Sequence, residues 1–209
     1  MASLPEFYQR SESPFGSSYE EHVKKFWKLF LSIPKTQNPL AVQGLCTQGQ
    51  PTSQPIFYVP CNLGGNTTKN CKISPGRGIL IPIICIVITE GELGNAPVNE
   101  LQTVARKDQD SVHDMELEIK VDNNRIVLDH NTLLNFRIIT GDFHVNIPPN
   151  GIYGNPGQQM AVADGYYVIT KPLTAGDYKI SFEGKMDCSG QKCFEQTFST
   201  KNIVNLKVV

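Results

Sequence analysis

The sequence has no hydrophobic run long enough to cross a membrane. Its longest apolar stretch, residues 79–88, is interrupted by Pro82 and has about half the length that a bilayer-spanning helix needs. Residues 1–10 also lack the apolar core of a secretory signal peptide. We therefore expect a soluble protein with no membrane partner and a cytoplasmic location.

The chain also has no excess of charge of either sign. Its 19 basic and 20 acidic residues leave a formal net charge of -1, and 40% of its residues are hydrophobic, which is typical of globular proteins. Binding to a phosphate backbone depends mainly on clustered positive charge. We therefore expect no nucleic-acid partner.

Motifs that carry chemistry are equally scarce. No cysteine and histidine pairs occur at the spacing of a zinc site, and no Gly-x-Ser-x-Gly elbow is present. Glycines recur over residues 151–157, but without the strand-loop-helix context of a phosphate-binding loop. The sequence predicts no cofactor, and it favours a protein that is not an enzyme.

Cysteines are present in an even number, six, which suits disulfide bonds if the compartment is oxidising. Cys188 and Cys193 are the pair that we expect first, because the Ser-Gly sequence between them can turn tightly. Reduced structural thiols are the alternative, and Cys85 in the apolar stretch is predicted to be a small buried residue. The cysteines and a glycosylation sequon at Asn66 make an extracellular location the alternative to the cytoplasm.

One helix is predicted near the N-terminus, over residues 18–32. Ser18 followed by Glu21 is typical of a capping box, and Pro34 ends the helix. The apolar residues that follow the cap have the spacing of one buried helical stripe; they are Val23, Phe26, Trp27, Phe30 and Leu31. We expect this stripe to pack on a sheet.

Most of the remaining chain has the pattern of β-strands. Residues 115–121, 178–182 and 204–208 alternate between apolar and polar side chains, as half-buried strands do. Residues 78–89 are rich in apolar, β-branched side chains, which indicates a strand buried on both faces with Pro82 at a bulge or an unpaired position.

Shorter elements complete this prediction. They are a strand over 134–138, a short helix over 98–105, and a hairpin turn at Asn123 and Asn124. The sequence therefore predicts a mostly β fold. It is an antiparallel β-sandwich, similar to a jelly roll, that forms one domain over residues 18–209, and residues 1–17 form an N-terminal extension.

Several short motifs follow one another along most of the chain in a recognisable order. They are Trp27, residues 32–34 and 38–39, Cys46, Gln50, residues 71–83, residues 163–168, residues 172–173, Gly176 and residues 182–184. In these motifs the sequence resembles a family of uncharacterised β-rich proteins from archaea and bacteria, some of them exported. Members share an N-terminal helix with tryptophan and an Ala-Asp-Gly-Tyr strand motif. The resemblance implies a β-rich architecture and no known activity.

Two groups of residues are candidates for a site. Asp142 and His144 lie two apart on a predicted strand, near Asp129 and His130. An imidazole with carboxylates can bind a divalent metal or transfer protons. A metal-dependent enzyme is therefore the alternative function, with His130, Asp142 and His144 as ligands.

The second candidate is the predicted long loop at residues 150–164. Its ring and amide groups suit a polar or carbohydrate-like ligand; they are Tyr153, Asn155, Gln158 and Gln159. A packed crossover between sheets is the structural alternative for this loop. We favour a non-enzymatic binding or assembly module whose partner is such a ligand, another protein or a second copy of the chain.

Overall fold

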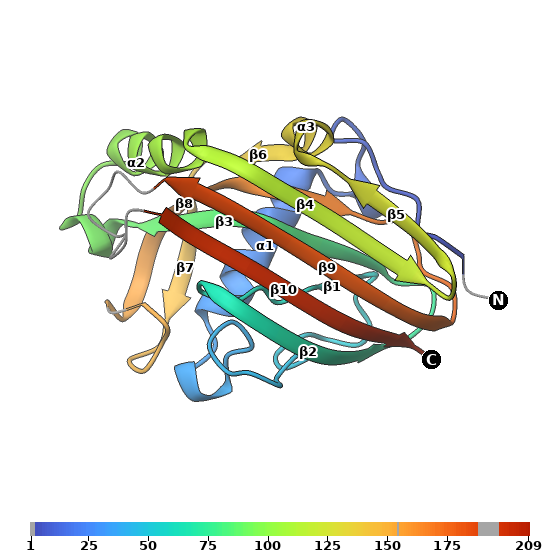
Figure 1. Ribbon diagram of the computed structural model, residues 1–209. Coiled ribbons are helices and arrows are strands. Elements are labelled where there is room, and N and C mark those ends of the chain that lie inside the picture. The colour runs from blue at the N-terminus through green and yellow to red at the C-terminus, as the bar shows by residue number, and fades with distance from the viewer. Residues whose placement is uncertain (1–2, 154, 188–196) are drawn as a thin grey trace.

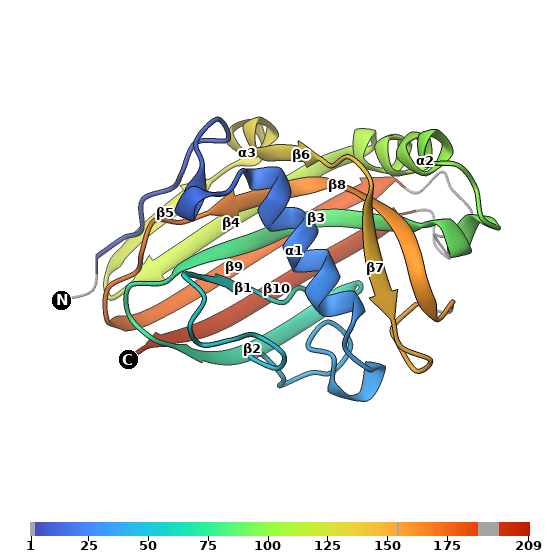
Figure 2. The same ribbon diagram turned by 180° about the vertical axis from the view of Figure 1, so that it is seen from behind.

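The computed structural model describes residues 3–153, 155–187 and 197–209. In these residues two five-stranded sheets lie face to face, and one helix crosses the back of the first sheet (Figure 1, Figure 2). The first sheet has the order β1-β3-β8-β6, with β7 also paired to β8, and the second has the order β2-β10-β9-β4-β5. The prediction of a mostly β, sandwich-like domain is confirmed.

The first sheet is buried on both faces at its centre. Its strands are β1 (Ile56–Tyr58), β3 (Gly78–Thr89), β6 (Arg137–Ile139), β7 (Phe143–Ile147) and β8 (Gly157–Ile169). Nearly all of β3 is buried, as its continuous apolar sequence predicts, because a helix covers one face and the second sheet covers the other. Pro82 lies in register with Tyr167, and the pairing of β3 with β8 shifts register between Pro82 and Ile84. The predicted irregularity therefore follows directly after Pro82.

The second sheet is buried on its inner face only. Its strands are β2 (Gly65–Ile73), β4 (Val112–Val121), β5 (Asn124–Leu128), β9 (Gly176–Asp187) and β10 (Thr197–Val208). Buried and exposed residues alternate along β4 and β10. Gly184 of β9 lets the sheets approach closely, since a Cβ there would lie 2.7 Å from Cβ of Ile84 in β3.

The sheets are mixed, which corrects the prediction of a purely antiparallel sandwich. β1 runs parallel to β3, and β2 runs parallel to β10. Parallel neighbours need long connections rather than tight turns. Alternation within one strand carries no information about the direction of its neighbour, so the sequence pattern could not reveal this. The jelly-roll connectivity stays a prediction.

Helix α1 (Tyr19–Leu31) is the predicted amphipathic helix. The Ser18 side chain accepts a hydrogen bond from the Glu21 amide at 3.2 Å, which caps the first turn. Phe26, Trp27 and Phe30 are buried, and the helix lies across the first sheet (Figure 2). The Trp27 Nε1 donates to the Tyr167 hydroxyl of β8 at 2.9 Å, so the indole has both an apolar contact and a polar partner.

Two other elements differ from their predicted form. Helix α2 (Val98–Asp110) continues past residue 105, because Asp108 and Gln109 face inward and are buried. Residues 134–138 are only partly a strand. Asp129 caps helix α3 (His130–Leu133), which leads into η4 (Leu134–Phe136), and β6 starts only at Arg137. In both places buried or capping polar residues override the apolar spacing.

The predicted hairpin between β4 and β5 is present, with its turn one residue earlier than expected. Val121 pairs with Asn124, so the turn residues are Asp122 and Asn123. Asp122 has a φ of 51°, a conformation that aspartate tolerates better than most residues.

The N-terminal segment is part of the fold rather than a separate extension. The Tyr8 amide donates to the Ile169 carbonyl at 2.9 Å, and the Lys171 amide donates to the Glu6 carbonyl at 2.8 Å. Short 3-10 turns, η1 (Pro14–Gly16), η2 (Lys35–Gln37) and η3 (Glu90–Leu93), complete the described elements. No helix in the described residues is long and apolar enough to cross a membrane.

Candidate functional site

The outer face of the second sheet is open. Helix α1 covers the first sheet, but no helix or strand of the described residues crosses in front of β2, β10, β9 and β4 (Figure 1). Near one end of these strands the face is hollowed, with a volume of about 680 Å³. We call this feature the basic hollow; its polar lining residues are Asn70, Lys72, Lys120, Asp122, Asp177, Lys179, Asn205 and Lys207.

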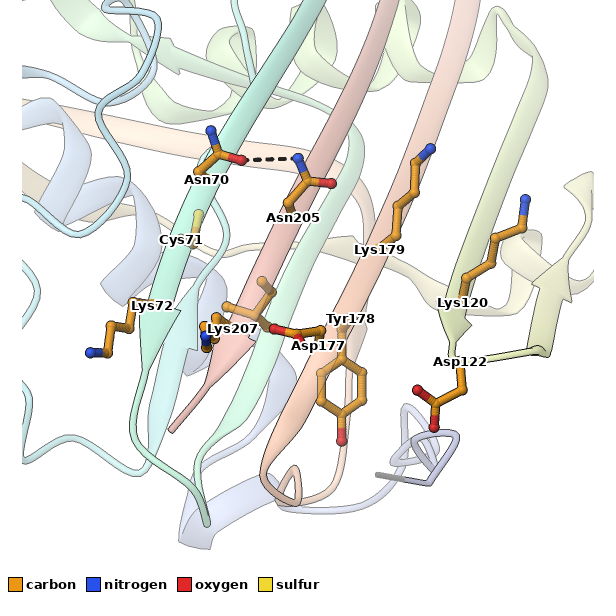
Figure 3. Close-up of a pocket in the computed structure, with 11 residues that line it drawn as sticks. Asn70, Cys71, Lys72, Lys120, Asp122, Asp177, Tyr178, Lys179, Asn205 and Lys207 are labelled. Carbon is orange, nitrogen blue, oxygen red and sulfur yellow. Dashed lines mark hydrogen bonds between the residues drawn. The ribbon is translucent and has the colours of Figure 1, made fainter. Parts of the chain in front are cut away.

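Strand register places these side chains in rows across the sheet. Asn205 lies opposite Asn70 on one side and opposite Lys179 on the other, and Lys179 lies opposite Lys120. Residues directly opposite each other on one face have Cβ atoms about 5 Å apart. Two amides and two lysines therefore follow one another across four neighbouring strands, in the order Asn70, Asn205, Lys179 and Lys120 (Figure 3).

Positive charge in the hollow is only partly neutralised. Lys120 forms an ion pair with Glu118 at 2.8 Å, but Lys72, Lys179 and Lys207 have no ion-pair partner in the part of the chain that the structure describes. Lys179 lies opposite Lys120, whereas Lys207 lies opposite Asp177. Lysines therefore outnumber aspartates in the hollow.

Hydrogen-bonding groups accompany the charges. The Asn205 Nδ2 donates to the Asn70 Oδ1 at 2.9 Å, which fixes the two amides side by side (Figure 3). Asp177 and Asp122 lie at the end of the hollow and supply acceptors. Tyr178 is buried, and its hydroxyl donates to the Thr174 carbonyl at 3.0 Å. The hollow therefore presents charged groups and hydrogen-bonding groups, and the one aromatic residue in its lining is buried.

The loop candidates predicted from sequence do not form one exposed surface. β8 begins at Gly157, so Gln158 and Gln159 lie in a strand and the loop is shorter than predicted. Asn155 Nδ2 donates to the Gly91 carbonyl, and Gln159 Oε1 accepts from the Gly91 amide at 2.8 Å. Only Gln158 is exposed without such a bond in the described residues.

Tyr153 is half-buried and packs against the main core. Burial raises the pKa of its hydroxyl. With two amides tied to η3 and the ring packed inward, the loop has the contacts of a packed crossover. Its role in ligand binding stays a prediction.

The metal candidates lie on separate elements. The Asp129 carboxylate caps α3 by accepting from the Thr132 amide at 2.9 Å, and the half-buried His130 begins that helix. His144 is exposed on β7, and Asp142 is exposed just before it. Among the described residues, no three histidine, cysteine, aspartate or glutamate side chains are grouped as a metal ion requires. The structure therefore gives the proposed ligands no shared centre.

A disulfide joins Cys46 and Cys71, whose Cα atoms are 5.5 Å apart. It fixes the segment after α1 to β2. Nearby, the buried Lys69 Nζ donates to the Pro39 carbonyl at 2.6 Å, and burial lowers the pKa of this lysine. The predicted bridge between Cys188 and Cys193 lies outside the described residues.

Cys61 and Cys85 are free thiols. Cys85, which the sequence predicts to be a small buried residue, is half-buried. It lies over Gly165, where a Cβ would come within 2.4 Å of the Cys85 Cβ. Hydrogen bonding to Cys61 and burial raise the pKa of the Cys85 thiol. Gly165 of the Ala-Asp-Gly-Tyr motif therefore makes room for a side chain on the neighbouring strand.

No family model matches the sequence, and no curated protein or solved structure matches it either. The family resemblance stays a prediction, and its motif residues serve the fold. Gln50 exchanges two hydrogen bonds with the Tyr58 backbone at 2.8 Å each. Asp164 is fully buried and accepts two bonds from Arg137 at 2.9 and 2.8 Å. The motifs therefore support the architecture and identify no ligand.

Proposed function

We propose that this domain is a non-enzymatic binding module that holds an acidic polysaccharide in the basic hollow. The observation that carries the proposal is the placement of Lys179 opposite Lys120, with no acidic partner for Lys179 among the described residues. An open sheet face with unpaired charges is an arrangement that a bound polyanion stabilises.

The mixture of groups favours a carbohydrate over a nucleic acid. Lysines attract carboxylate or sulfate groups, whereas Asp122, Asp177 and the carbonyl oxygens of the amides accept hydrogen bonds from sugar hydroxyls. A DNA phosphate backbone has no hydroxyl donors for those acceptors. The ligand class is therefore an acidic sugar chain rather than a phosphate chain.

We also propose that the protein works in an oxidising compartment. The Cys46–Cys71 disulfide supports this, because such bonds persist mainly outside the reducing cytosol. An acidic polysaccharide is also a ligand expected outside cells. We therefore propose an extracellular location in place of the cytoplasmic one that we expected first.

Binding to defined polymers tests the proposal. Isothermal titration calorimetry with polygalacturonate and dextran sulfate should show saturable binding that weakens with added salt, and neutral dextran should not bind. A double variant, Lys120→Ala with Lys179→Ala, should bind about tenfold more weakly, since two surface charge contacts are worth roughly 0.5–1 kcal/mol each.

The same sheet face offers a matched control. Lys185 pairs with Asp114 at 2.8 Å, and Lys201 pairs with Glu183 at 2.6 Å. Replacing these two lysines by alanine removes the same formal charge from the far end of the face and should change the affinity less than twofold. Equal losses in both double variants would show attraction to net charge alone, and tight binding of double-stranded DNA would overturn the assignment to carbohydrate.

Assembly is the other reading of a binding module. Sedimentation of the protein alone, at the concentrations used for titration, distinguishes the two. Concentration-dependent dimers that disappear in the Lys120→Ala, Lys179→Ala variant would assign the hollow to a second copy of the chain instead.

A further inference from the structure

A second cationic pocket lies beside the basic hollow, and Lys72 lines both. Its volume is about 270 Å³, several times the roughly 30 Å³ that one water molecule occupies. We call it the Arg77 pocket; it is lined by Thr47, Gln50, Thr52, Phe57, Lys72, Ile73, Ser74, Arg77 and Val209. None of these side chains is acidic, and Lys72 and Arg77 form no ion pair with a described residue.

Arg77 is held rigidly at the buried side of this pocket. Its residue is only 7% exposed, and its Nη2 donates to the carbonyl of Ile56 at 2.9 Å and of Pro51 at 3.4 Å. The guanidinium carbon lies 5.7 Å from the centroid of the Phe57 ring. These contacts fix the guanidinium in place before any ligand arrives, which lowers the entropic cost of binding.

The guanidinium keeps unused donor capacity. Its Nε is buried and has no hydrogen-bond partner among the described residues, although buried donors are nearly always paired. Thr52 and Ser74 are exposed at the pocket, together with Thr47 and the ammonium group of Lys72. An unsatisfied guanidinium with hydroxyls and an amine around it has the groups that bind a compact oxyanion.

We propose that the Arg77 pocket binds a compact oxyanion group, a carboxylate, sulfate or phosphate, and that this group belongs to the ligand held in the basic hollow. The second half of this statement rests on the proposed function and on the position of Lys72, which lines both cavities. The oxyanion itself follows from the pocket alone. An acidic sugar chain on the open sheet face would then place one charged substituent against Arg77.

Small anions test the pocket separately from the hollow. In a protein labelled with ¹⁵N, the Arg77 Nε–Hε resonance should shift saturably when sodium sulfate, sodium phosphate or sodium glucuronate is added at constant ionic strength. Sodium chloride is the control. The three anions distinguish a tetrahedral oxyanion from a carboxylate, because the preferred one should saturate at the lowest concentration.

Exposed variants keep the test independent of folding. Arg77→Lys removes the guanidinium, but it also removes the hydrogen bonds to the carbonyls of Pro51 and Ile56. Ser74→Ala and Thr52→Val are therefore the primary variants. Together they should weaken anion binding at least about tenfold, the effect expected for one lost hydrogen bond to a charged group. Lys120→Ala with Lys179→Ala should leave it unchanged, because neither lysine lines the Arg77 pocket.

The two proposals fail separately. Three results would overturn anion binding at the Arg77 pocket and leave polysaccharide binding to the hollow untouched. The Arg77 Nε–Hε resonance would not shift, would shift equally with chloride, or would shift at the same anion concentration in the Ser74→Ala, Thr52→Val variant. Saturable binding of sulfate or glucuronate without any polysaccharide binding would support the pocket and overturn the proposed function.

Discussion

The two sheets have similar strands and opposite surroundings. The first sheet is covered by α1 on one face and by the second sheet on the other, whereas the second sheet has one face open (Figure 1, Figure 2). Accordingly β3 is apolar on both faces and β10 alternates. The first sheet therefore serves stability, and the second leaves a polar face available for a ligand. The predictions below test this division, beginning with the largest expected effect.

Trp27→Ala should destabilise the protein by about 3–5 kcal/mol, the usual cost of removing a large buried aromatic side chain. Trp27 is 2% exposed and hydrogen-bonds Tyr167 of the first sheet. Denaturant unfolding measures the loss, with Lys179→Ala on the open face as the control, which should change stability by less than about 0.5 kcal/mol. A loss below about 1 kcal/mol for Trp27→Ala would show that the covering helix is peripheral.

Removing the Cys46–Cys71 disulfide should cost about 3 kcal/mol. The two residues are 25 apart in sequence, and the loop entropy that such a bridge removes from the unfolded chain has this size. Cys46→Ser with Cys71→Ser should unfold at lower denaturant concentration and lose most of its response to a reducing agent. Cys61→Ser with Cys85→Ser should keep that response. An unchanged midpoint after reduction of the native protein would contradict a stabilising bridge.

Gln159→Ala should cost about 1–2 kcal/mol, because it leaves the Gly91 amide without its acceptor. Gln158→Ala, one residue away and exposed, should cost less than about 0.5 kcal/mol. Thermal unfolding of both variants decides whether the β7–β8 connection is a packed crossover. If both variants lost a negligible amount of stability, the β7–β8 connection would not be a packed crossover, and the binding-loop interpretation would be favoured.

The smallest effect concerns pH. His22 is buried, its Nε2 lies 2.8 Å from the Pro14 carbonyl, and burial lowers its pKa below the ordinary 6.5. The unfolded chain then binds a proton at His22 more readily than the folded protein does. Stability should therefore fall as pH drops below about 6.5 and level off below the folded pKa.

His22→Gln, which retains a donor for Pro14, should flatten this part of the pH profile. Protonation of Glu20 also lowers stability, but only at more acidic pH, because Lys24 and the Gly141 amide hold the pKa of that carboxyl below 4.5. A profile with the same slope near pH 6 in both proteins would assign the dependence to another group.

The sequence predicts what depends on local pattern. Helix α1, the bulge at Pro82 and the alternation of β4, β9 and β10 each follow from residues within one segment. It does not predict β2 as a full strand or the start of β8 at Gly157, because both segments are polar on the exposed side and contain glycine. The predicted strand over residues 134–136 is wrong for a related reason. Asp129 caps α3, and residues 134–136 continue from that helix as a 3-10 turn.

The candidate site could not be predicted because it depends on register between distant segments. The exposed position of Lys179 follows from alternation, but its place beside Lys120 and Asn205 requires the strand order of the second sheet. Arg77 shows the same limit, since nothing local indicates that its guanidinium lies over Phe57. The sequence carries one partial signal for the site, which is the presence of lysines at the polar positions of several alternating strands.

The most direct test of the division between the sheets is amide chemical-shift mapping with polygalacturonate. We predict saturable shifts at Lys72, Lys179 and Asn205, and none around Trp27 beneath α1. Shifts concentrated at Tyr153, Asn155 and Gln158, with the open face of the second sheet unaffected, would contradict the proposed site and assign binding to the β7–β8 connection.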